Sequence, residues 1–168
     1  MGVQSVSILG GDVIAAAPAG YCVARDAGRQ GADNAVVLMG RCSASGAADP
    51  AVVMVSVGEA GSGSLMAAGS GRLRAYFTSE AGRAVLSRDG QAADVAVLES
   101  AMEGGAFLMR LRDGAVGEYW RAVTDLRGRL VTLSVNGAEG AARDLPPDEG
   151  RALLMAALAA LRAANSQG

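Results

Sequence analysis

The sequence of 168 residues contains no histidine and no lysine, so all of its basic side chains are arginines. These absences exclude imidazole general bases and imidazole metal ligands, as well as Schiff-base lysines and the lysine of a phosphate-binding P-loop. A GC-rich genome explains most of this bias, since 24 glycines accompany the arginines. The chemical consequence holds whatever the cause. Because no other catalytic motif is present, we expect neither an enzyme nor a metal or cofactor site.

Long apolar runs are also missing. The longest, Ala152 to Leu161, is far shorter than the roughly 20 residues that cross a bilayer, so the chain is not expected to span a membrane. The first residues lack the basic start and apolar core of a secretory signal, so an exported protein would have this chain as its mature part. A net charge of −2 and a pI near 5.1 give no broad positive field, which argues against a nucleic-acid partner.

The residues that are present suit one compact domain, because a hydrophobic content of 51% can form a core of ordinary size within residues 1–168. Two alternating apolar segments separated by glycines predict a short hairpin within residues 5–16. The polar residues 25–34 are predicted to be a connector. The apolar runs 35–42 and 51–57 have strand length and predict two neighbouring central strands, buried on both faces.

The middle of the chain changes character twice. Glycines dominate residues 58–71, which we predict to be a loose loop, with a mobile flap over a pocket or partner as the functional alternative. From Leu73 apolar residues recur at three- and four-residue spacing, which predicts a helix to about Ser87. Ser79 offers an alternative, because it could cap a shorter helix that begins there.

The last third predicts strands and then a helix. Short turns separate four runs of strand length that should form an antiparallel meander: 95–100, 106–112, 118–126 and 129–136. Pro146 and Pro147, followed by acidic residues, predict the start of a long C-terminal helix. Its buried stripe is Leu153, Leu154, Ala157, Leu158 and Leu161. The predicted fold is therefore α+β, an antiparallel sheet of roughly six to eight strands with an internal helix and the C-terminal helix packed on it.

The two cysteines, Cys22 and Cys42, suit neither a zinc site, which needs further ligands, nor a thioredoxin-type centre, which needs two neighbouring cysteines at a helix start. Free buried thiols and a single disulfide both stay open. We favour the disulfide, because each cysteine lies at the end of a predicted strand and no cysteine is left over. Such a bond would stabilise the fold by about 3 kcal/mol. It persists only in an oxidising compartment, which predicts the periplasm or cell envelope of a bacterium.

Arginines recur in close couples that suggest an anion site. Residues two apart on a strand share a face, so Arg110 and Arg112, with Arg121 on a neighbouring strand, could form a planar anion-recognition patch. The alternative, which we favour, is an ordinary solvated face in which nearby carboxylates such as Glu99 and Glu118 balance these charges.

Four further side chains are candidates for contact with a partner. Tyr119 and Trp120 are adjacent on a predicted strand and therefore point to opposite faces, so one should enter the core against the C-terminal helix and the other should be exposed. Leu65 and Met66 stand among small and polar residues of the predicted loop. We expect an exposed apolar or aromatic patch to include some of these four.

Two sets of segments carry a resemblance to known proteins. The opening "VIAAAPAGYCV" and the final strand "RLVTLSV", which leads through a proline-rich turn to a long helix, resemble the Mog1/PsbP-like architecture. The segments "YFTSEAGRAVLSRDG" and "EYWRAVTDLRGRLVTLSV" and the terminal "RAAN" resemble uncharacterised envelope proteins of marine and photosynthetic alphaproteobacteria. The resemblance implies a fold and a compartment but no activity. PsbP is an extrinsic photosystem subunit and Mog1 binds a small GTPase, so both are binding modules.

Two functions follow as hypotheses. The first is a non-catalytic envelope module that binds a protein partner or assists a membrane complex. The second is a small-molecule or anion-binding domain whose pocket is covered by residues 58–71. An enzyme is the least favoured reading, because without histidine or lysine only carboxylates and arginines could act as its chemical groups. The sequence leaves the oligomeric state open.

Overall fold

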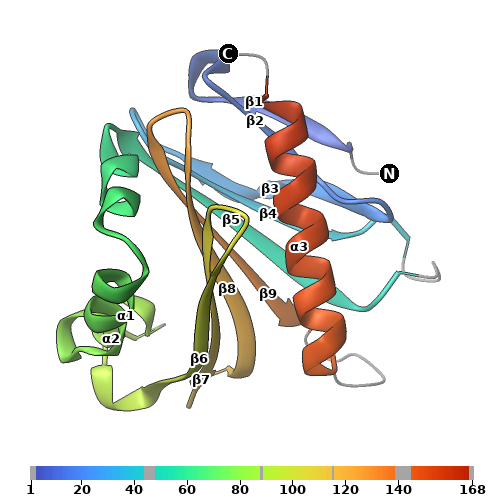
Figure 1. The fold of residues 1–168 in the computed structure, drawn as a ribbon. Coiled ribbons are helices and arrows are strands. Elements are labelled where there is room, and N and C mark those ends of the chain that lie inside the picture. Colours follow the sequence, from blue (N-terminus) through green and yellow to red (C-terminus); the bar gives the residue numbers. More distant parts are fainter. Residues whose placement is uncertain (1–2, 44–47, 88, 115, 139–144, 167–168) are drawn as a thin grey trace.

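The protein is described here by a computed structural model that covers residues 3–43, 48–87, 89–114, 116–138 and 145–166, and only the backbone of residues 25–27. These residues confirm the α+β class. They form a seven-stranded antiparallel sheet, a separate two-stranded hairpin and helices on both faces of the sheet (Figure 1). The predicted sheet of six to eight strands corresponds to the seven-stranded one.

The strands of the main sheet follow the order β3-β4-β5-β9-β8-β7-β6, and each neighbouring pair is antiparallel. Both sequence predictions of neighbours are confirmed, since β4 lies beside β5 inside the sheet and β6 to β9 form a meander. The pairing of β5 with β9 joins the two halves of the chain. The bounds are β3 Tyr21–Gln30, β4 Ala35–Arg41, β5 Ala51–Ala60, β6 Val95–Glu103, β7 Ala106–Asp113, β8 Gly117–Leu126 and β9 Arg129–Gly137.

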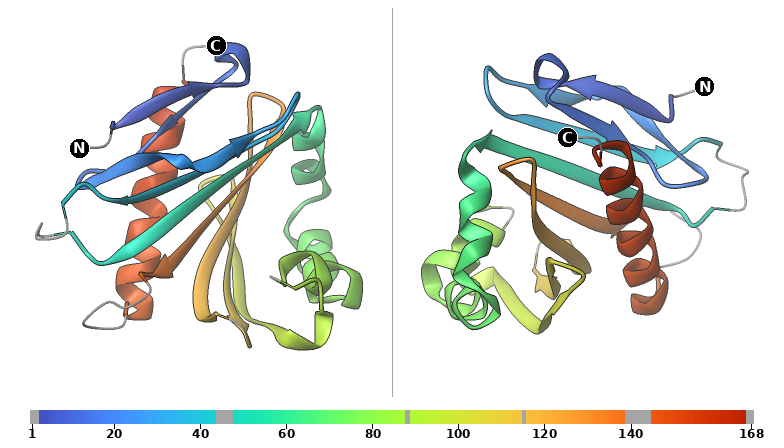
Figure 2. Two further views of the ribbon diagram at one scale, coloured as in Figure 1. Left: turned by 180° about the vertical axis from the view of Figure 1, so that it is seen from behind. Right: turned by 45° about the horizontal axis from the view of Figure 1, so that its top comes forward.

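The C-terminal helix α3 (Pro147–Ala164) covers one face of the sheet, as predicted (Figures 1 and 2). The predicted stripe is buried, and Leu154 and Leu161 are fully enclosed. The predicted hairpin is confirmed: β1 (Ser5–Ile8) pairs with β2 (Val13–Ala16), and the hairpin packs on the same side as α3. This face therefore holds the larger hydrophobic core.

A second, smaller core lies on the opposite face, beneath α1 (Ser70–Thr78) and α2 (Glu80–Leu86). Phe77 of α1 stacks on Phe107 of β7, with the ring centroids 5.9 Å apart. The chain separates the two helices at Ser79, whose Oγ accepts a hydrogen bond from the Gly82 N–H at 3.1 Å. The alternative in which Ser79 caps a helix is thus confirmed, and the single uninterrupted helix is wrong.

Helices α1 and α2 contact β6, and a 3₁₀ helix contacts β5 beside its C-terminal end, so most of β4 and β5 has no described helix over it on this second face. Seen from behind in Figure 2, strands β3 to β5 lie in front of α3. Buried and half-buried residues consequently alternate along β4 and β5, and Leu38 and Met54 are cross-strand neighbours on the half-buried side. The prediction that both strands are buried on both faces is wrong for this reason.

Two predicted connectors are also more regular than expected. Strand β3 continues to Gln30 through a register shift between Ala24 and Arg29, so most of the predicted polar connector belongs to an edge strand. Residues 58–71 are not a loose loop. They complete β5, form a 3₁₀ helix (Ser62–Ala68) and begin α1. Gly63 fixes this segment, because its N–H donates to the Gly128 carbonyl at 3.0 Å and the adjacent Asp125 leaves no room for a side chain.

The two cysteines form a disulfide, as predicted, with a Cα–Cα distance of 5.0 Å. Cys22 lies on the edge strand β3 and Cys42 directly follows β4, so the bond reinforces the β3–β4 hairpin. Gln4 lies over it. Its Nε2 donates to the Tyr21 carbonyl at 2.9 Å and approaches both sulfur atoms, at 3.5 and 3.4 Å. The disulfide therefore also helps to hold the N-terminal segment against β3.

Asn165, just after α3, attaches the helix to the N-terminal hairpin. Its Oδ1 accepts from the Ile14 N–H at 2.8 Å, and its Nδ2 donates to the Ile14 carbonyl at 2.7 Å. The amide thus pairs with the free edge of β2 as a neighbouring strand would. The same Nδ2 donates to the Leu161 carbonyl at 2.7 Å.

Arg129, at the start of β9, connects three parts of the chain. Its guanidinium pairs with Asp12 at 3.1 Å and with Asp33 at 2.8 Å, and it donates to the Gly58 carbonyl at 2.9 Å. The hydrogen bond from Arg129 and another from the Ala60 N–H lower the pKa of Asp33. The two carboxylates raise the pKa of Arg129 despite its burial. Arg129 therefore stays charged and ties the turn before β2 to the main sheet.

Candidate functional site

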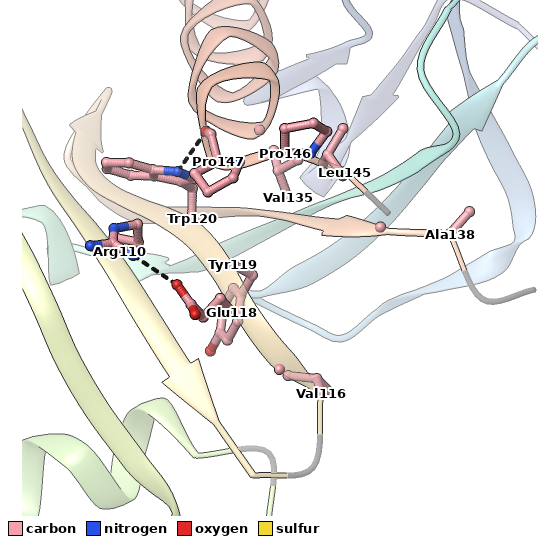
Figure 3. A pocket seen from close by; sticks show the side chains of 13 residues that line it. Arg110, Val116, Glu118, Tyr119, Trp120, Val135, Ala138, Leu145, Pro146 and Pro147 are labelled. Atoms are coloured by element: carbon pink, nitrogen blue, oxygen red, sulfur yellow. Dashed lines mark hydrogen bonds and ion pairs between the residues drawn. The ribbon is translucent and has the colours of Figure 1, made fainter. Parts of the chain in front are cut away.

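A pocket of about 510 Å³ lies between the start of α3 and the neighbouring ends of β8 and β9 (Figure 3). This volume falls within the roughly 300–1,000 Å³ that is common for ligand sites. Among the described residues, thirteen from β7 to the first turn of α3 line it: Arg110, Val116, Gly117, Glu118, Tyr119, Trp120, Val135, Gly137, Ala138, Leu145, Pro146, Pro147 and Gly150. Three of the predicted binding residues, Arg110, Tyr119 and Trp120, are among them.

The pocket exists because β8 and β9 separate. They pair continuously from Leu126 and Arg129 at their connecting turn to Trp120 and Val135, and no pair follows. Beyond this point β8 stays paired with β7 and β9 stays paired with β5. In Figure 3 the two strands lead away from each other, toward Val116 and Ala138. We call this opening, between residues 117–119 of β8 and 136–138, the strand fork.

Backbone polar groups face the strand fork from both sides. The β8–β9 turn has two residues, Arg127 and Gly128, both with positive φ, so Leu126 and Arg129 form a hydrogen-bonded pair. Hydrogen-bonded pairs alternate along an antiparallel ladder, so every second residue of β8, up to Trp120, bonds to β9. The next residue in this series is Glu118, and its counterpart on β9 is Gly137. Their N–H and C=O groups point into the fork and form no ladder pair there.

Trp120 forms the inner wall of the pocket. The indole Nε1–H donates to the Pro147 carbonyl at 3.0 Å, which fixes the ring beneath the first turn of α3. Gly150 lets the helix approach, because a Cβ at this position would stand 3.3 Å from Trp120 Cδ1. The guanidinium of Arg151 lies 6.0 Å from the ring centroid. The wall is therefore a preformed aromatic and proline surface.

Charged side chains at the pocket compensate one another. Arg110 lies 2.7 Å from Glu118 and 3.4 Å from Glu99, and Arg112 reaches the other oxygen of Glu118 at 3.4 Å. These ion pairs agree with the favoured interpretation, in which nearby carboxylates balance the charges of Arg110 and Arg112. An anionic ligand would have to compete with the carboxylates of Glu99 and Glu118 for Arg110.

The planar patch of three arginines is wrong. Arg110 and Arg112 share a face with Trp120 and Glu118, whereas Arg121 pairs with Met109 and faces the other side of the sheet. The error lies in the register between the strands, which reverses the face of every residue when it shifts by one. On its own face Arg121 lies 5.7 Å from the Tyr119 ring centroid, and its Nε is buried without a hydrogen-bond partner among the described residues.

Tyr119 and Trp120 point to opposite faces, as predicted, and Trp120 packs in the core that α3 covers. The expectation that one of them is exposed is wrong, because both faces carry helices at this place and the side chains are only 6% and 8% exposed. Burial raises the pKa of Tyr119, whose hydroxyl donates to the Leu86 carbonyl at 3.4 Å. Tyr119 thus contributes little more than its backbone to the pocket.

Leu65 and Met66 lie in the 3₁₀ helix, away from the pocket. Leu65 is 38% exposed, whereas Met66 is half-buried against the smaller core. Neither lines the pocket at the strand fork or a second cavity, of about 300 Å³, between β1 and β3. Their predicted role in binding stays a prediction.

Sequence reasoning missed the part of the pocket that follows β9. The sequence predicts Pro146 and Pro147 only as the start of a helix, although their rings also line the pocket with Leu145. Gly137 lies one residue beyond the predicted strand 129–136, and no sequence pattern marks it as a pocket residue. The signal that the sequence did contain was Trp120, because aromatic side chains line many peptide-binding grooves.

Other features of the described residues bear on function only weakly. Within the described ranges no three His, Cys, Asp or Glu residues are grouped as metal ligands, and no helix is long and apolar enough to cross a membrane. Comparisons of the chain with protein-family models, with curated proteins and with solved structures gave no match. The resemblance to Mog1/PsbP-like and alphaproteobacterial envelope proteins therefore stays a prediction.

Proposed function

We propose that the protein is a non-catalytic binding module of the bacterial periplasm or cell envelope, and that a protein partner or a membrane complex docks at the strand fork. The observation that carries this proposal is the pocket wall of Trp120 and two prolines, next to backbone groups without ladder partners. Tryptophan is enriched among the residues that dominate protein interfaces. The disulfide supports an oxidising compartment.

A photo-crosslinking amino acid placed at Ala138, on the rim of the pocket, tests this function in the native host. The proposal expects a covalent adduct with one recurrent protein. The same amino acid at Gly40 is the matched control, since that position is a half-exposed strand residue outside the pocket with open space around it. No adduct at Ala138, or equal adducts at both positions, would contradict docking at the fork.

A small-molecule ligand is the second candidate, favoured by the pocket's volume of about 510 Å³. Residues 58–71, the predicted cover, do not line this pocket. Native mass spectrometry of the protein purified from its host separates the two candidates. A small bound molecule whose retention depends on the pocket would support this candidate against the protein partner.

A further inference from the structure

We propose that the partner contributes an extended peptide segment that inserts at the strand fork and pairs with the free edge of β8. This inference rests on the proposed function and specifies how the partner is recognised. It starts from the N–H and C=O groups of Glu118, which follow the hydrogen-bonding series of β8 one step beyond its last pair with β9. Addition of a strand to a sheet edge supplies such groups with backbone partners.

The opposite side of the strand fork, on β9, also has backbone groups that form no ladder pair. Gly137 is the residue of β9 that Glu118 would have met had the ladder continued, and its exposed backbone has no side chain to obstruct an incoming strand. Both strands remain anchored by their outer neighbours, Glu118 by Arg112 and Gly137 by Ala51. A segment could therefore enter without any loss of existing ladder pairs.

The pocket also supplies a place for a side chain. A strand at the fork directs alternate side chains to opposite faces of the sheet. On the face of α3, such a side chain meets Trp120, Leu145 and Pro146, all of which line the pocket. Arg110 and Glu118 already neutralise each other beside it. The fitting segment is thus an extended peptide with an apolar residue that packs in the pocket, while its neighbours bond through the backbone.

The first step of the test selects random peptides, displayed on phage, against the full chain. Selected peptides are then measured on the Gly137→Leu variant, whose new side chain enters the pocket beside Leu145 at an ordinary contact distance of 3.7 Å. Gly40→Leu is the control, a strand glycine with nothing within 4 Å of an added Cβ. We expect Gly137→Leu to abolish binding and Gly40→Leu to leave it unchanged. Failure to obtain peptides of this kind would overturn both the inference and peptide docking at the fork.

The second step asks whether the bound peptide is a strand. N-methylation of single peptide amides removes one donor at a time, and we expect affinity to fall roughly tenfold at the few amides that bond to Glu118 or Gly137 and to stay unchanged at the others. In the protein, exchange of the Glu118 and Gly137 amide protons, followed by NMR, should slow on binding. If binding depends on the pocket but no single N-methylation lowers the affinity and these amides stay unprotected, strand addition is refuted and the proposed function stands.

Discussion

Removal of the Cys22–Cys42 disulfide should lower the stability of the protein by an amount that its position allows us to work out. The bond joins residues 20 apart in the sequence. In the chain-entropy model a loop of this size restricts the unfolded chain by about 11 cal/mol/K, which corresponds to about 3 kcal/mol at 25 °C. For a domain of this length each kcal/mol shifts Tm by roughly 2–4 °C, so the expected decrease is roughly 6–12 °C.

The double variant Cys22→Ala/Cys42→Ala, measured by calorimetry beside the oxidised wild type, tests this value. Wild type treated with reductant is the control that separates the cross-link from the side chains, and it should melt close to the double variant. An intact-mass measurement on the unreduced protein should show two hydrogens fewer than the reduced chain. Equal Tm values for oxidised and reduced wild type would refute the reasoning, since they would mean that the bond does not restrict the unfolded chain.

Three further predictions follow from other contacts. The pKa of Asp33 is lowered by its hydrogen bond from Arg129, so its contribution to stability is complete above its unfolded pKa of roughly 3.9 and is lost as the pH falls through the lower folded value. Asp33→Asn should be less stable than wild type at pH 7 in urea titrations, with a difference that shrinks at acidic pH. Asn165→Ala removes the contacts with Ile14 and should cost about 1–3 kcal/mol, with faster exchange of the Ile14 amide proton. Arg121→Met removes a buried guanidinium nitrogen that has no hydrogen-bond partner in the described part of the chain, so its Tm should equal or exceed that of wild type; a clear decrease would show that Arg121 has an important contact.

The spacing of apolar residues predicted most of the helices and strands, because the residues that share a face in each predicted helix or strand are in fact buried. The stripe of α3 is an example, since Leu154 and Leu158 recur at the helical period and both lie in the core. The four-strand meander was predictable for a related reason. Its turns are too short for any connection except one between antiparallel neighbours.

The errors come from contacts between distant parts of the chain. Residues 58–71 contain glycines that suggest a loose loop, yet Gly63 is needed for close packing against the turn between β8 and β9. The polar segment after Val23 gave no strand signal, because an edge strand has few apolar contacts to satisfy and can carry polar side chains. In both cases the partner segment determines the structure, and it is far away in the sequence.

The candidate site was predictable only in part for the same reason. A tryptophan on a strand is a reasonable candidate for binding, and Trp120 does line the pocket. The strand fork itself depends on which neighbours the two strands keep, since β8 follows β7 while β9 follows β5. The local sequence around Glu118 and Gly137 does not indicate which neighbouring strand β8 or β9 stays paired with.

The strand fork differs from two other strand edges of the molecule, where a side chain forms hydrogen bonds with the backbone groups of the edge strand. At β2, the side chain of Asn165 supplies both a donor and an acceptor to Ile14. At β6, Arg74 of α1 donates to the Ser100 carbonyl at 3.2 Å. Exposed strand edges invite pairing with other chains, and side chains at these positions prevent it. At Glu118 and Gly137 no described side chain does so, and Trp120 and two prolines line the neighbouring pocket. Among these three places, only the strand fork has ladder positions that no described side chain bonds, and it is there that the proposed peptide segment would pair.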